Sequence, residues 1–350
     1  MREAAPAGSY LPPTERRHER SDEEILDPDL EIIDAHHHLY DRPGARYLLD
    51  EYAGDVALGH RIVGSVYIEI MAMARTWGPE HLRSIGEIEF ANGIAAMAAT
   101  GFYGDCDVAA AIVGYADLRR GHAVGEVLDE AIARAPERFR GIRQITLEYD
   151  DPAMSAYISN PPPRGILDHP DLVAGLRELG RRGLVYDANA FHHRLSDFSR
   201  LADEVPETVF ALNHTGFPLL IGLSEDQRRE EIAAWRRDLR ELASRPNVVC
   251  KVGGLGQVFL GFGFDSRPVP PTSRELASAW EPFVVEAIDA FGADRCMMMS
   301  NFPVDGRSCG FVPYWNALKY IVRGASREEK EQLFQLTAER VYRIDRPSRS

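Results

Sequence analysis

Three consecutive histidines, His36, His37 and His38, follow the apolar run "EIIDA", which is typical of a buried strand. A buried imidazole costs free energy unless it is hydrogen-bonded or bound to a metal. Because side chains alternate across a strand, Asp34, His36 and His38 are predicted to share one face, and His37 to lie on the other. Two imidazoles two residues apart on one face can bind one metal ion. We therefore predict His36 and His38 as metal ligands and His37 as a structural residue.

Further histidines stand at the ends of later apolar runs. His192 and His193 follow residues 183–191, and His214 lies near the end of residues 208–216. A single such histidine could simply bond to a neighbouring carbonyl, but four at strand ends favour a site. His192 and His214 are predicted as catalytic residues and as metal ligands, and His193 as a loop residue.

Charged and amide side chains accompany the histidines. Glu69, Arg143 and Lys251 lie in separate apolar runs and are predicted to bind substrate. Glu69 and Lys251 could instead form an ion pair that closes the fold, and Arg143 could brace its wall. The last apolar run ends with Asn301 and, just past a proline, Asp305, both predicted as catalytic. The alternative for Asp305 is that it caps the next turn.

The elements that must position these residues alternate along the chain. Eight apolar runs, mostly separated by segments with helical spacing, lie at residues 31–39, 61–71, 108–118, 139–149, 183–191, 208–216, 247–256 and 295–305. This order predicts an α/β fold, a (β/α)8 TIM barrel in a single domain (28–350) after an N-terminal arm (1–27). An open doubly wound sheet would show a glycine-rich phosphate turn after its first strand, where the histidines stand. Three irregular stretches, 40–60, 150–169 and 257–271, follow strands and are predicted as long loops on the catalytic rim.

Composition excludes several classes of partner. The net charge of −14 disfavours nucleic acid and anionic membranes. No apolar run is long enough to span a bilayer. Four scattered cysteines without a CxxC pair favour reduced thiols in a cytoplasmic protein. A small-molecule substrate is the expected partner, and a homo-oligomer stays open.

Several motifs carry a resemblance to a known family. The segments "IIDAHHHLYD", "GIRQ", "LNHTGFP", "KVGGLG", "SNFPVD" and "TAERVYRI" resemble the amidohydrolase superfamily, in particular its lactonase-type TIM-barrel branch, over about residues 28–345. The resemblance implies that His36 and His38 are the HxH motif of strand one, and that His192 and His214 are the histidines of strands five and six. The aspartate of strand eight falls at Asn301, which is a departure, because an amide cannot act as a base and is a poor metal ligand.

This resemblance implies a hydrolase that opens a lactone or a related C–O or C–N bond. One divalent metal, Zn²⁺ in the first instance, is expected; the alternative is a metal-free site in which Arg143, Lys251 and the histidines polarise a carbonyl. A histidine or Asp305 would take the proton from water. Apolar residues near the rim suggest a small aromatic or polyketide-like substrate: Tyr67, Met71, Phe191, Phe217 and Phe302. A lyase or isomerase on the same barrel and an inactive binding protein remain alternatives.

Overall fold

The structure, a computed structural model, describes residues 22–345 except 43, 150–157 and 159–160. Eight strands form one sheet in which neighbouring strands are parallel and follow chain order. They are β1 (Ile32–His37), β4 (Ile62–Ile68), β5 (Asp107–Gly114), β6 (Phe139–Ile145), β7 (Val185–Asn189), β8 (Phe210–Leu212), β9 (Val248–Val252) and β10 (Cys296–Met298).

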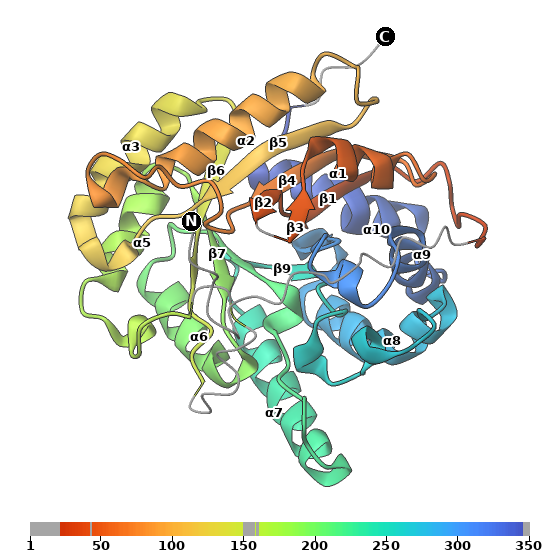
Figure 1. Cartoon of the computed structure of the whole chain (residues 1–350). Coiled ribbons are helices and arrows are strands. Elements are labelled where there is room, and N and C mark those ends of the chain that lie inside the picture. The colour runs from red at the N-terminus through yellow and green to blue at the C-terminus, as the bar shows by residue number, and fades with distance from the viewer. Residues whose placement is uncertain (1–21, 43, 150–157, 159–160, 346–350) are drawn as a thin grey trace.

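The sheet closes on itself just beyond β10. His37 pairs in parallel with Phe302, the His38 N–H donates to the Phe302 carbonyl at 2.8 Å, and the Asn301 N–H donates to the His36 carbonyl at 2.8 Å. Helices surround the strands (Figure 1), so the predicted (β/α)8 barrel is confirmed. In this fold the carboxyl ends of the strands form the mouth that carries chemistry.

Except for α1, the helices lie where the sequence shows helical spacing. The helices are α1 (Leu49–Val56), α2 (Ile85–Ala98), α3 (Gly125–Arg134), α5 (Leu172–Arg181), α6 (Leu195–Glu204), α7 (Glu225–Ala243), α8 (Ser273–Phe291), α9 (Phe311–Ile321), α10 (Arg327–Glu331) and α11 (Thr337–Tyr342). Ser326 and Glu329 form a capping box at the start of α10. Thr272 and Glu275 form another at the start of α8.

The barrel interior is filled by small and branched side chains from the strands, including Ile33, Val66, Ala111 and Met297. Helix α11 packs its apolar face against this inner cluster. The hydroxyl of Thr337, at the start of α11, donates at 3.4 Å to the carbonyl of Ala293, just before β10. The C-terminal helix therefore closes the end of the barrel opposite the mouth.

A bulge in β1 decides which histidines enter the barrel. Asp34 pairs with Ser65 of β4, but His37 pairs with Tyr67, so three steps along β1 match two along β4. One extra residue in a strand reverses the alternation of the residues that follow. Asp34 accordingly faces outward, where the Tyr52 hydroxyl of α1 donates to it at 3.1 Å. The prediction that Asp34 shares a face with His36 and His38 is therefore wrong.

Residues 40–60, predicted as an irregular loop, contain a two-stranded hairpin and helix α1. The hairpin joins β2 (Tyr40–Arg42) to β3 (Ala45–Tyr47). Residues 257–271 do form a rim loop, with short turns at Val258–Leu260 and Phe264–Ser266. Half of the predicted loop 150–169 and most of the predicted arm 1–27 lie outside the described residues.

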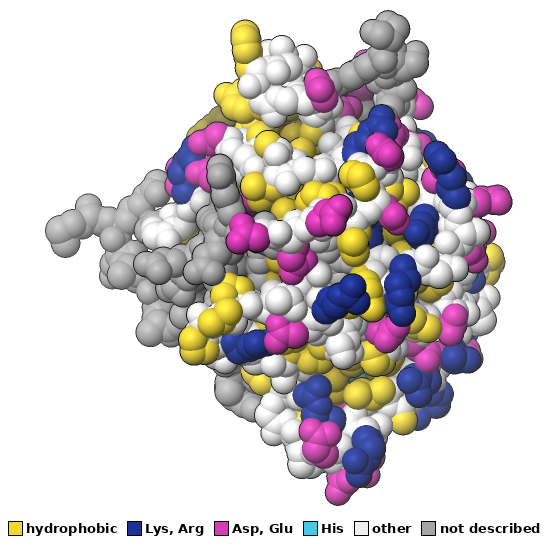
Figure 2. Space-filling model, turned by 90° about the vertical axis from the view of Figure 1, so that its right-hand side faces the viewer, with side chains coloured by type: hydrophobic (Ala, Val, Ile, Leu, Met, Phe, Trp, Pro, Cys, Tyr) yellow, Lys and Arg dark blue, Asp and Glu magenta, His cyan; other side chains and the backbone are white. Residues whose placement is uncertain are grey.

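The described end of the N-terminal segment lies against α8 and α9. Glu23 accepts the Ser273 N–H at 2.8 Å, and the Leu26 N–H donates to Asn316 at 2.9 Å. On one face of the molecule, basic and acidic side chains are interspersed with hydrophobic ones (Figure 2). Within the described part of the chain, every helix is too short or too polar to cross a bilayer.

Candidate active site

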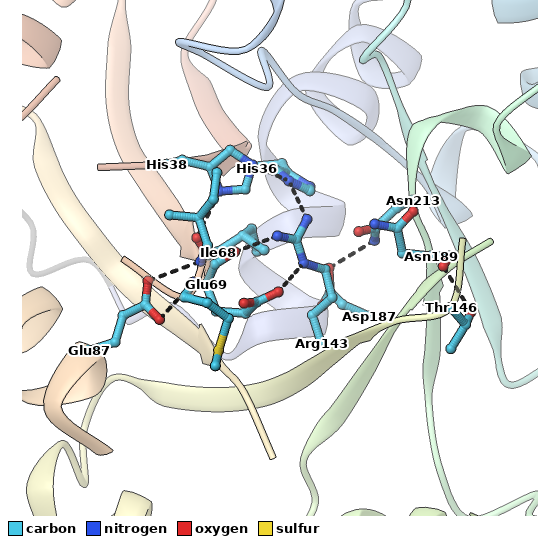
Figure 3. Close-up of polar contacts among 12 residues, drawn as sticks. His36, His38, Ile68, Glu69, Glu87, Arg143, Thr146, Asp187, Asn189 and Asn213 are labelled. Atoms are coloured by element: carbon cyan, nitrogen blue, oxygen red, sulfur yellow. Dashed lines mark hydrogen bonds and ion pairs between the residues drawn. The ribbon is translucent and has the colours of Figure 1, made fainter. Parts of the chain in front are cut away.

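Arg143 of β6 lies at the centre of the polar groups in the barrel mouth. Its Nε donates to Glu69 Oε1 at 2.7 Å, and its Nη2 donates to the Glu69 backbone carbonyl. Its remaining nitrogen, Nη1, lies 3.4 Å from His36 Nε2 (Figure 3). Both Arg143 and Glu69 are buried. Two bonds to one residue fix the guanidinium plane, so Arg143 is held with one donor edge turned toward His36.

The hydrogen bonds of His36 and His38 assign their tautomers. His38 Nδ1 lies 2.9 Å from the Ile68 carbonyl, so it carries the proton and leaves a lone pair on Nε2. His36 Nε2 accepts from Arg143, so its lone pair also lies on Nε2. These two Nε2 atoms are only 3.2 Å apart. Two facing lone pairs repel unless a cation or a proton lies between them.

His214 completes this cluster from the loop after β8. Its ring centroid lies 4.9 Å from that of His36, and among the described residues its buried Nδ1 has no hydrogen-bond partner. Its backbone has a φ of 54°, an unusual value for a side chain of this size. Gly254 at φ 69° packs against the His214 ring, and any side chain there would collide with it. The glycine of "KVGGLG" thus makes room for the imidazole.

Burial keeps the three clustered imidazoles neutral. It is the largest cause that lowers the pKa values of His36, His38 and His214 well below their usual range. The positive charges of Lys251 and Arg143 lower the pKa of His36 further. Neutral rings present lone pairs, so they can accept a proton or bind a metal at neutral pH.

The donor set fits a single metal ion. Two ligands of a tetrahedral zinc at about 2.0–2.1 Å are about 3.4 Å apart, close to the observed separation of the two Nε2 atoms. The second nitrogen of His38 is held by a carbonyl, as is usual for a metal-binding histidine. His214 supplies a third candidate ligand. A two-metal site fits poorly, because Asn301 stands where a bridging or terminal carboxylate would be needed.

Lys251 lies deeper in the barrel and pairs with a different carboxylate from the one predicted. Its Nζ lies 2.5 Å from Asp187 Oδ1, and both side chains are fully buried. Asp187 also accepts from the Asn213 amide at 3.0 Å and from the Tyr342 hydroxyl at 2.8 Å. Burial lowers the pKa of Lys251, while Asp187 opposes that shift. The alternative of a Glu69–Lys251 ion pair is therefore wrong, since each residue has another partner.

Asn301 and Asp305 bond to each other beside the end of β1. Asn301 Nδ2 donates to Asp305 Oδ1 at 2.7 Å, and the Gly256 N–H donates to Asp305 Oδ2 at 2.7 Å. Strand β10 ends at Met298 and Asn301 has a φ of 56°, so alternation does not set the direction of its side chain. Burial raises the pKa of Asp305 to about 7. Asp305 therefore joins the loops after β9 and β10 through both of its oxygens.

His192 is held apart from this cluster by a helix. Its Nε2 lies 2.8 Å from Glu231 of α7, and its Nδ1 accepts the Leu219 N–H at 3.2 Å. The ligand atoms of His192, His193 and Glu231 lie within 4.8 Å of one another, which is close enough for a metal. However, an Nδ1 that accepts a backbone N–H leaves the proton on Nε2, where a metal would have to bind. The structure thus places His192 in a hydrogen-bonded pair with Glu231, and not beside His36.

A family model described as amidohydrolase matches residues 33–344. The chain belongs to the amidohydrolase family. The uncharacterized protein y4mH of Sinorhizobium fredii is 32% identical over 339 residues, which is 90% of this chain and 99% of that protein. An L-fucono-1,5-lactonase of Burkholderia ambifaria is 28% identical over 68% of this chain and 72% of its own length.

Solved structures agree on the fold of this amidohydrolase. An amidohydrolase of Burkholderia multivorans has been solved with bound HEPES and, separately, with bound zinc. The first matches with a TM-score of 0.67 and the second with 0.68, each at 24% identity over 90% of this chain and 99% of the other. At this identity the likeness supports the barrel architecture of the amidohydrolase and says nothing of its substrate.

One wall of the amidohydrolase mouth is apolar. Phe191, Phe217 and Phe259 pack with ring centroids 5.2–5.4 Å apart, and Phe217 lies 4.7 Å from the His214 ring. Two residues expected at this rim face the helices instead. The Tyr67 hydroxyl donates to Glu87 of α2 at 2.8 Å, and Phe302 packs in the outer core against α9.

Sequence reasoning missed three residues that organise the amidohydrolase site. Asp187 could have been found, because it lies two residues after the inward Val185 and therefore on the same face of an otherwise apolar strand. Glu87 accepts the N–H groups of Ile70 and Met71 and holds the chain after β4 (Figure 3). It and Glu231 lie on helices, and nothing in their local sequence distinguishes them from solvated carboxylates.

Proposed function

We propose that this amidohydrolase opens a lactone or a related cyclic ester by attack of water at the barrel mouth. The observation that carries the proposal is the Arg143 guanidinium, which Glu69 holds rigidly beside three neutral imidazoles. A preoriented donor in a buried site stabilises the negative charge that develops on a carbonyl oxygen. The curated L-fucono-1,5-lactonase relatives support the lactonase class, and the apolar wall supports an aromatic or polyketide-like substrate.

In the proposed mechanism the substrate carbonyl oxygen accepts from Arg143 Nη1. Because Glu69 already fixes the guanidinium, no reorganisation is needed as the oxygen becomes negative. His214, which is neutral and lies beside His36, orients water and takes its proton. The hydroxide oxygen bonds to the carbonyl carbon, the ring C–O bond breaks, and the leaving alkoxide receives the proton. Asp305 is the alternative base.

A single divalent ion, for which Zn²⁺ is the first candidate, would be held by the Nε2 atoms of His36 and His38 with His214. Asp305 would then be the base, because an imidazole that binds a metal cannot take the proton from water. When bound, it would polarise the carbonyl and make bound water more acidic. The zinc in the solved Burkholderia multivorans amidohydrolase supports this choice of ion. Lys251, paired with Asp187, would support the site from below through its charge at His36, and neither residue would touch the substrate.

The test is hydrolysis of a lactone panel by purified protein of known metal content, with and without chelator. We expect ring opening, with incorporation of one oxygen atom when the reaction runs in isotopically labelled water. Full activity of metal-free protein in chelator would exclude the ion and leave the Arg143 and histidine mechanism. Turnover without label in the product would sink the hydrolase proposal.

Turnover without label in the product would favour a second candidate function, a lyase or isomerase. The observation behind it is Asn301, since an amide in place of the strand-eight aspartate removes the group best suited to activate water.

A further inference from the structure

A large cavity opens beside the candidate active site, between the loops that follow β4 and β5. Its volume is about 830 Å³, and its lining includes Arg83, Ser84, Tyr115 and Arg120. A smaller cavity of about 200 Å³ reaches Glu69, the residue that holds Arg143. Met71 and Tyr115 line both cavities, so the two lie next to each other. A ligand whose carbonyl lies at Arg143 and which passes Glu69 would point toward the larger space, which we call the side cavity.

Arg120 stands out among the arginines of this rim. Neighbouring Arg119 is paired with Asp117 at 2.8 Å, and Arg75 is paired with Glu89 at 2.5 Å. Arg120 has no side-chain hydrogen bond or ion pair with any residue that the structure describes, and its Nε is buried. Such a group normally finds a partner, so an unpaired guanidinium that lines a cavity points to a ligand.

The other groups of the side cavity favour an anion. Asp117 is already engaged by Arg119 and by the Gln144 amide, which donates to it at 3.0 Å. Glu80 is exposed at the edge. Burial raises the pKa of Tyr115 to about 12, so its hydroxyl stays protonated and can donate. The side cavity thus offers a free cation and a hydroxyl donor together.

We propose that the substrate carries a carboxylate that binds Arg120, with Tyr115 as a second donor, while its reacting carbonyl lies at Arg143. This inference rests on the proposed function and narrows it to acid-bearing lactones. A guanidinium can bind a carboxylate through two parallel hydrogen bonds, which fixes both the position and the orientation of the ligand. Arg120 is then a specificity residue, since it contacts the substrate away from the reacting atoms.

The test compares wild type with Arg120→Gln and Arg120→Lys. Arg134→Gln is the matched control, because it removes the same charge from an exposed arginine of α3. Calorimetry measures the Kd of isophthalate, and uncharged isophthalamide serves as the probe without charge. Loss of charged hydrogen bonds, each worth about 1.5–3 kcal/mol, should weaken isophthalate binding about 10-fold to 100-fold in Arg120→Gln. Arg120→Lys should recover part of the loss, and Arg134→Gln should bind like wild type.

Kinetics then links binding to turnover. For an uncharged aromatic lactone (phthalide) and its carboxylated derivative, the ratio of kcat/KM should favour the acid in wild type and fall about tenfold or more in Arg120→Gln. The inference is overturned if wild type and a folded Arg120→Gln bind isophthalate with equal affinity. It is also overturned if wild type binds isophthalamide as tightly as isophthalate. If wild type opens neither lactone but loses isophthalate binding in Arg120→Gln, the proposed function fails and the carboxylate site stands.

Discussion

Replacing Asp305 with Asn separates a catalytic role for this carboxyl from a structural one. The wild-type carboxyl accepts from Asn301 through one oxygen and from the Gly256 N–H through the other, each at 2.7 Å. An amide keeps one acceptor oxygen but turns a donor toward the second partner. One of the two bonds is therefore lost in Asp305→Asn, and a buried donor loses its acceptor. We expect a loss of about 1–3 kcal/mol in the free energy of unfolding at acidic pH.

The pH dependence of that loss follows from the buried carboxyl. Burial raises the pKa of Asp305 from 3.8 to about 7, so the unfolded chain releases this proton at a lower pH than the folded one. The stabilising contribution of the carboxyl is complete below about pH 4 and is lost as pH rises through about 7. Three pKa units correspond to about 4 kcal/mol. Since an amide does not ionise, Asp305→Asn should become more stable relative to wild type between pH 5 and pH 8.

The assay is urea unfolding of both proteins at several pH values, with turnover measured on the folded enzyme. Asp34 and Glu69, whose pKa values burial raises to about 6 and about 7, act equally in both proteins and cancel in the difference. A stability difference that stays constant from pH 5 to pH 8 would refute the assignment of a raised pKa. If Asp305 is the base, turnover falls about a hundredfold or more above about pH 7, where the wild-type carboxyl is ionised, and the deficit shrinks at lower pH. Normal turnover with reduced stability assigns the base to His214.

Three further predictions concern the cluster. If one ion is bound, His36→Ala and His38→Ala should each empty the metal site and remove nearly all activity, because the acidity of the bound water goes with the ion; metal analysis of the folded variants checks this, and retained metal would count against the assigned ligands. His37→Gln should lower the unfolding free energy by about 1 kcal/mol and spare turnover, because its Nε2 bonds to Ser65 of the neighbouring strand at 2.9 Å; loss of turnover in a stable variant would contradict the outward placement. Arg143→Lys should lower kcat about 10²-fold to 10³-fold with a smaller change in KM, since the oriented donor is lost; steady-state kinetics would show unchanged kcat if Arg143 only braces the wall.

The sequence predicts the positions of His36 and His38, but for an incomplete reason. Strict alternation places His36 and His38 on the same face as Asp34. In the structure the two histidines face inward as predicted, but Asp34 faces outward, because a bulge lies between Asp34 and His37. Ile33 and Ala35 point inward before the bulge, and without it His37 would enter the barrel. A bulge depends on how two strands pair, and no residue of β1 marks it. Apolar periodicity therefore locates a strand well and its local register poorly.

His192 shows a second limit of sequence reasoning. Its place just after β7 suits a rim ligand, yet the direction of its ring is set by Glu231, a residue on α7. Glu231 is far from His192 in the sequence, and nothing in the sequence of α7 distinguishes it from a solvated carboxylate, so the contact could not be predicted. The eight strands were predictable because each is a local pattern, whereas partners supplied by another element depend on how the helices pack.

The two buried ion pairs follow a rule of barrel geometry that local patterns do not contain. Inward side chains of a (β/α)8 barrel lie in layers that alternate strands contribute. Glu69 follows β4 and Arg143 lies on β6, which are the second and fourth strands of the barrel. Asp187 lies on β7 and Lys251 on β9, which are the fifth and seventh strands. A pair between Glu69 and Lys251 would join an even strand to an odd one, across layers. Each ion pair is instead confined to strands of one parity, and burial keeps the imidazoles of the mouth uncharged.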